Sequence, residues 1–73
     1  MKSYKKVGYE KSMLGTEVTV ITHKSAEQRG FEVNKSYNGK LMGKVDWHVG
    51  CPVFECDTGI LGLGYECHLV EEV

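Results

Sequence analysis

A pattern of short apolar runs separated by glycine restricts the fold of this chain more than any other feature. The run TEVTVIT at residues 16–22 is β-branched at six of its seven positions, and such side chains fit a pleated strand better than a helix. Nine glycines and one proline divide the rest of the sequence. No segment of ten or more residues places its apolar positions at the 3.6-residue period of a helix. The sequence therefore predicts an all-β domain of short strands.

Further strands are expected wherever apolar and polar residues alternate between turn signals. They lie at residues 31–33, 36–41, 44–49, 53–57 and 65–70. Gly39 predicts a bulge or bend within its strand, and the polar residues 23–30 predict a loop with room for one helical turn. Alternation also places Tyr65 on the face that carries Cys67. The core is expected to contain Val18, Val20, Phe31, Val33, Tyr37, Leu41, Val45, Phe54, Cys56, Cys67 and Leu69.

A length of 73 residues allows one domain. We expect about five antiparallel strands in a small barrel over residues 15–73, because closing a sheet removes edges that aggregate. Residues 1–14 are expected to form an N-terminal arm or a cover. No apolar run approaches the roughly 20 residues of a membrane helix, and no apolar segment follows the charged first residues. We therefore expect a cytoplasmic protein without a membrane partner.

Three parts of the sequence carry a resemblance to small SH3-like barrels of the bacterial and bacteriophage type. They are GTEVTV at residues 15–20, RGFEVNKSY at residues 29–37, and VFECDTG with LVEEV at residues 53–59 and 69–73. The second resembles the H-G-F-x-I-G-x-x-Y stretch of such barrels, with Arg29 replacing histidine and Asn34 replacing glycine. Asparagine tolerates a left-handed backbone, so neither change breaks the pattern. The resemblance covers residues 15–73 and implies a binding module of SH3-like fold without catalytic residues.

The three cysteines form no even-numbered disulfide framework. His48, Cys51 and Cys56, followed by Cys67 or His68, give a set of ligands that zinc accepts. Their spacing lacks the C-x2-C pairs of common zinc sites, and free cysteine is among the most buried residue types. We therefore expect core thiols at Cys56 and Cys67 and neither a metal nor a cofactor, with a zinc site as the alternative.

Charge is divided unevenly along the chain. Residues 1–44 carry nine basic and four acidic residues, a net charge of +5, whereas residues 45–73 carry six acidic and no basic residues, a net charge of −6. Either the two halves pair across strands as ordinary surface charge, or they form a dipolar surface that steers a charged partner.

The candidate partner-binding residues combine lysines with exposed aromatic side chains, which are frequent in protein interfaces. They are Tyr4, Lys5, Lys6, Tyr9, Trp47 and His48. Trp47 is either an exposed anchor of this surface or a plug of the core, and His48 points to the opposite face of its strand. His23 and His68 are expected at the surface.

No nucleophile elbow, phosphate loop, zinc-protease motif or paired-carboxylate motif occurs in the sequence, so we do not expect an enzyme. We expect a non-catalytic protein-binding module. By analogy with phage barrels, it would be a small modulator or inhibitor of a host enzyme such as RNA polymerase or a defence nuclease. The alternative is a nucleic-acid-binding barrel, in which the lysines and tyrosines of the arm contact phosphates and stack on bases.

Overall fold

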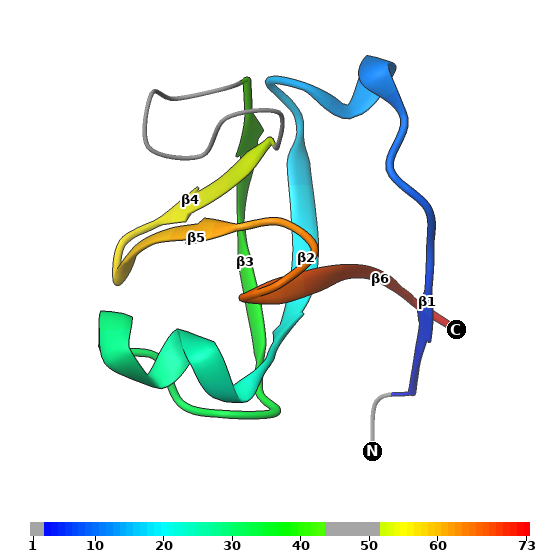
Figure 1. The fold of residues 1–73 in the computed structure, drawn as a ribbon. Helices are drawn as coiled ribbons and strands as arrows, with labels where there is room; N and C mark the ends of the chain where they lie inside the picture. The colour runs from blue at the N-terminus through cyan, green and yellow to red at the C-terminus, as the bar shows by residue number, and fades with distance from the viewer. Residues whose placement is uncertain (1–2, 44–51) are drawn as a thin grey trace.

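The computed structural model describes residues 3–43 and 52–73, which form one antiparallel sheet (Figure 1). Its strands are β1 (Tyr4–Lys6), β2 (Glu17–Thr22), β3 (Ser36–Met42), β4 (Val53–Cys56), β5 (Gly59–Gly62) and β6 (Cys67–Glu72). Two 3₁₀ helices, η1 (Lys11–Met13) and η2 (Lys24–Arg29), connect them. The prediction of a small all-β domain of short antiparallel strands is confirmed.

The order of strands in the sheet is β1-β6-β2-β3-β4-β5. β4, β5 and β6 cross β2 and β3 at a steep angle, so the sheet curls around its core (Figure 1). Within the described residues no ladder joins β1 to β5, and the sheet is therefore open between them. A parallel bridge between Leu63 and Cys67 links the end of β5 to the start of β6.

The core lies inside this curl and draws on every strand from β2 to β6. Phe54 and Leu41 are cross-strand partners, and the ring of Phe31 meets Tyr37 edge to face with centroids 4.9 Å apart. Of the expected core residues, Val20, Phe31, Leu41, Phe54, Cys67 and Leu69 are buried. Val18, Tyr37 and Cys56 are partly buried and pack against them. Val45 lies outside the described residues.

The expected strand at residues 44–49 lies outside the described residues, and two of the other expected strands differ from the structure. Residues 31–33 form no strand, and Val33 is only half-buried in a turn. Thr22 explains this turn, because its carbonyl accepts a hydrogen bond from the Asn34 N–H and its hydroxyl donates to the Glu32 carbonyl. Asn34 adopts a left-handed φ of 56°, as expected for asparagine in place of glycine.

The last strand begins at Cys67, two residues later than expected. Gly64 has a φ of +104°, and the Glu66 N–H donates to the carbonyl of Gly62. Residues 64–66 therefore form a turn, which leaves Tyr65 51% exposed while Glu66 is 2% exposed. The expectation that Tyr65 shares a face with Cys67 in the strand is wrong, because the turn precedes the strand.

The polar segment before Gly30 forms a six-residue 3₁₀ helix, η2, which is longer than the single turn expected. Gly30 ends η2 in a left-handed conformation, with φ 87°, and Ala26 anchors it by packing into the core. No helix in the described ranges has the length and apolar character needed to cross a membrane.

The two oppositely charged parts of the sequence are interleaved by the sheet. Lys5 of β1 lies opposite Glu71 of β6, and Lys40 of β3 lies opposite Glu55 of β4. Cross-strand pairing of charges, one of the two interpretations of the sequence, therefore describes these two pairs. Arg29 of η2 also forms an ion pair with Glu66 in the turn before β6, with Arg29 Nε 3.0 Å from Glu66 Oε2.

Candidate functional site

The first three predicted site residues form β1, at one end of the sheet. Tyr4 is half-buried, and its hydroxyl lies 3.4 Å from Ser36 Oγ. Lys5 is exposed and its Nζ is 3.1 Å from Glu71 Oε1. Lys6 is exposed on the same side of β1 as Tyr4. The structure therefore brings these three together but does not point them in one direction.

The remaining predicted residues do not join this group in the described structure. Tyr9 lies between β1 and η1 and is 43% exposed. Trp47 and His48 lie outside the described residues.

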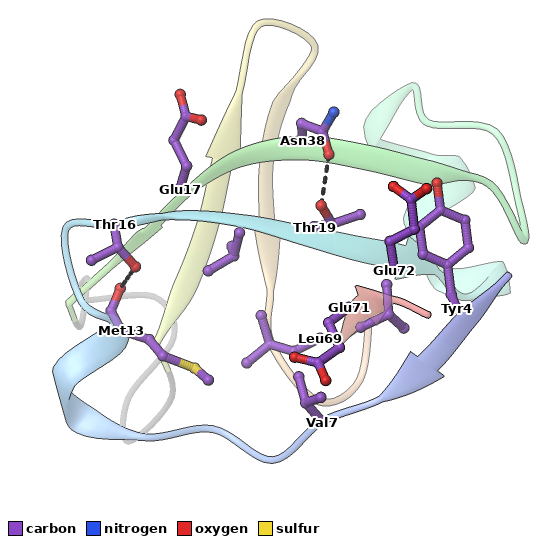
Figure 2. Close-up of a pocket in the computed structure, with 12 residues that line it drawn as sticks. Tyr4, Val7, Met13, Thr16, Glu17, Thr19, Asn38, Leu69, Glu71 and Glu72 are labelled. Atoms are coloured by element: carbon purple, nitrogen blue, oxygen red, sulfur yellow. Dashed lines mark hydrogen bonds between the residues drawn. The ribbon is translucent and has the colours of Figure 1, made fainter. Parts of the chain in front are cut away.

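A groove of about 580 Å³ lies beside β1, between the N-terminal segment, β2 and the end of β6 (Figure 2). We call it the acidic groove. We call its apolar lining residues the floor; they are Val7, Met13, Val18, Leu69 and Val70. We call its polar lining residues the rim; they are Tyr4, Thr16, Glu17, Thr19, Asn38, Glu71 and Glu72. Tyr4 is the predicted site residue that lines it.

Short hydrogen bonds hold the polar rim of the acidic groove. The Thr16 hydroxyl donates to the carbonyl of Met13 at 2.6 Å, which ties the start of β2 to η1. The Thr19 hydroxyl donates to Asn38 Oδ1 at 2.7 Å, which ties β2 to β3 (Figure 2). The groove is thus built on paired strands, and such sites hold their geometry better than sites on loops.

The acidic groove exists because β2 and β6 separate before either strand ends. Their ladder runs from Thr22 paired with Cys67 to Thr19 paired with Val70. One more step in this register would place Val18 opposite Glu71, yet there the strands diverge. The end of β6 pairs instead with β1, and the start of β2 remains paired with β3. A wedge between two strands of one sheet is therefore open to a ligand.

A second hollow of about 550 Å³ adjoins the first and shares Glu17 and Asn38 with it. The remainder of its lining comes from the β3–β4–β5 side of the sheet, including Lys40 and Glu55, which are cross-strand partners. Its opposite charges therefore lie close to each other, whereas the acidic groove carries carboxylates only.

A pair of histidines that the sequence did not reveal links η2 to β6. His23 Nε2 lies 2.7 Å from His68 Nδ1, and His23 Nδ1 lies 3.2 Å from the Tyr65 carbonyl oxygen. A carbonyl only accepts, so His23 Nδ1 donates to it, and with both rings neutral the His68 Nδ1–H donates to His23 Nε2. Burial, with His23 and Lys6 nearby, lowers the pKa of His68. The two histidines are 45 positions apart in the sequence, and no local pattern connects them.

The described cysteines are not arranged as metal ligands. Cys67 is buried, and the loss of hydration, with Glu66 and Cys56 nearby, raises the pKa of its thiol to about 12. Such a thiol stays protonated at neutral pH and is therefore a poor nucleophile. Within residues 3–43 and 52–73, no three His, Cys, Asp or Glu side chains are grouped to hold a metal ion. His48 and Cys51 of the zinc alternative lie outside these ranges.

No protein-family model, curated protein sequence or solved structure matches this chain.

Proposed function

We propose that the chain is a non-catalytic protein-binding module and that the acidic groove is its binding surface. The observation that carries this proposal is the groove itself, whose lining combines apolar side chains with carboxylates, hydroxyls and an amide. This combination suits a polypeptide, because apolar side chains fill the floor while the rim accepts hydrogen bonds from main-chain and side-chain donors.

Sequence resemblance extends the proposal to a class of partner. SH3-like barrels of the bacterial and bacteriophage type are binding modules, and this chain has a compact antiparallel sheet of matching size. We accordingly propose a modulator or inhibitor of a host enzyme, such as RNA polymerase or a defence nuclease. What supports this finer proposal is the resemblance over residues 15–73.

The charges around β1 argue against the nucleic-acid alternative. Glu71 already neutralises Lys5, and the adjoining groove presents further carboxylates from Glu17 and Glu72. A phosphate backbone lying along β1 would meet this negative potential, whereas binding to nucleic acid depends on an excess of exposed cations.

Affinity capture from a bacterial lysate, followed by mass spectrometry, tests the proposed function. Asn38→Trp is the blocking variant, because Asn38 is exposed on the groove rim and an indole there obstructs the groove. Gln28→Trp, at an exposed position of η2 away from the groove, is the matched control. We expect the wild type and Gln28→Trp to retain the same protein and Asn38→Trp to lose it.

Two results would contradict the proposal. The first is a retained protein that Asn38→Trp binds as well as the wild type does, because the groove would then not be the binding surface. The second is tight binding of oligonucleotides that weakens steeply with salt, which is the signature of counterion release.

A further inference from the structure

We infer that the acidic groove takes an extended, lysine- or arginine-bearing segment of a partner protein as an added strand. This inference deepens the proposed function and rests on it. It follows from the backbone groups that face the groove, from the distribution of its carboxylates and from its apolar floor.

The two diverging strands direct backbone hydrogen-bonding groups toward the groove. Residues of an antiparallel strand alternate in the direction of their N–H and C=O groups. In β2, Thr16 and Thr22 hydrogen-bond toward β3, so Glu17 directs its backbone groups toward β6. In β6, Leu69 hydrogen-bonds toward the β1 segment, so Glu72 directs its groups toward β2. Both sets of groups face the wedge between the strands, as they do at a sheet edge that accepts a peptide strand.

Two glutamates, one on each strand, disfavour closure of the wedge. In the β2–β6 register, in which Thr19 pairs with Val70, Glu17 would lie directly opposite Glu72. Like charges opposite each other destabilise a strand pair, which disfavours a continuation of the ladder to this point. A cationic side chain of a partner placed between the strands reverses this repulsion.

The carboxylates of the groove are distributed along its length. Glu17 and Glu72 lie at opposite ends of the groove, and Glu71 lies on its lower side beside Leu69 (Figure 2). Lys5 offsets Glu71 through their ion pair, and Lys40 is the cross-strand partner of Glu17. Among the described residues, the rim nevertheless contains acidic and no basic side chains. Carboxylates distributed along a groove match an extended chain with spaced cations better than a single ion.

The floor of the groove offers apolar surface to a bound strand. Val7, Met13 and Val18 are half-buried side chains that pack against the core, and they keep part of their apolar surface accessible. Because successive side chains of a strand point to opposite faces, an added strand with alternating apolar and basic residues can satisfy floor and rim together.

The test uses a labelled synthetic peptide of alternating valine and lysine, seven residues long, and two versions with glutamine or glutamate in place of lysine. The double variant Glu17→Gln with Glu72→Gln removes the charges at both ends of the groove. The control, Glu10→Gln with Glu27→Gln, removes two exposed charges that do not line the groove. Fluorescence anisotropy at two salt concentrations gives each dissociation constant.

We expect the lysine peptide to bind the wild type and the control alike and the groove variant about tenfold more weakly, as for two partly exposed ion pairs. The difference should shrink at high salt, and the glutamate peptide should not bind. The groove variant should also unfold at the same or higher urea concentration than the wild type, because it relieves a repulsion. Weaker binding would then not result from a damaged fold.

Equal binding of the lysine peptide to the groove variant, equal binding of the glutamine peptide, or no binding of any peptide would overturn this inference. A concentration-dependent dimer that excludes the peptide would do the same by identifying a second copy as the occupant. If the peptides fail while Asn38→Trp still loses a captured protein, the proposed function stands and only its basic partner is refuted. If the capture also fails, both are refuted.

Discussion

Replacing Gly39 with alanine tests how closely β3 and β4 approach each other. Gly39 lies in β3 opposite Val18 of the groove floor. A Cβ atom there would lie 2.2 Å from the Glu55 carbonyl oxygen, 2.8 Å from the Phe54 ring and 2.9 Å from Cys56 Cβ. The nearest of these is backbone, so β3 and β4 must separate to admit the methyl group.

The expected cost follows from two contributions. Overpacking a tight interior costs about 1–3 kcal/mol, and each weakened β3–β4 hydrogen bond costs about 0.5–1.5 kcal/mol more. We therefore expect Gly39→Ala to lower the free energy of unfolding by about 3 kcal/mol. At about 4–8 °C per kcal/mol for a domain of this size, the melting temperature should fall by about 12–24 °C.

Urea titration and thermal melting followed by circular dichroism measure this change. Gly8→Ala is the control, because a Cβ at Gly8 has no atom within 4 Å, and alanine there leaves stability unchanged or raises it by up to about 1 kcal/mol. A loss below about 0.5 kcal/mol for Gly39→Ala would refute the close approach of β3 to β4 at this position.

Three further predictions concern groups that the fold buries or brings together. Glu66→Ala should lower the free energy of unfolding by about 2–4 kcal/mol in urea titration, because the buried carboxylate accepts a hydrogen bond from the Gly62 N–H at 2.7 Å and pairs with Arg29. Glu66→Gln should lower it less, and a loss below about 1 kcal/mol for the alanine variant would contradict these contacts. The pKa of His68 is lowered from 6.5 in the folded chain, so on acidification the unfolded chain binds a proton at a higher pH than the folded chain does. The contribution of His68 to the free energy of unfolding is therefore complete above about pH 6.5 and is lost as the pH falls below it. Urea midpoints at pH 7.5 and 5.0 measure this slope, and His68→Gln should flatten it; an unchanged slope in the variant would assign the pH dependence elsewhere. Cys67 should resist a thiol-specific reagent in the native state and react in urea, because its thiol is buried with a pKa of about 12. Peptide mapping measures this labelling, and native labelling of Cys67 as fast as that of Cys56 would show that the core opens.

The strands and most of the core were predictable because their signals are local. The β-branched run at residues 16–22 became β2, and alternation identified Phe54 and Leu41 as core residues. Where the prediction was wrong, a distant contact decided the outcome. Thr22 holds residues 32–35 in a turn, and no feature of that segment itself indicates this.

The candidate site was predictable only in part, for the same reason. Tyr4 and Lys5 were identified by composition, yet the groove beside them depends on the divergence of β2 from β6. The opposition of Glu17 and Glu72 follows only from the register that pairs Thr19 with Val70. The pairing of His23 with His68 and the burial of Glu66 likewise depend on the β2–β6 ladder and on the turn before β6.

Backbone amide mapping tests the central claim, that a partner protein binds the acidic groove, most directly. The measurement is the change in amide chemical shift and hydrogen exchange of the ¹⁵N-labelled protein when the captured partner is added. The account predicts shifts and slowed exchange at Glu17 and Glu72, whose N–H groups face the wedge, and at Val18 and Glu71 beside them. Changes confined to η2 or to β5, with these four amides unaffected, would contradict it.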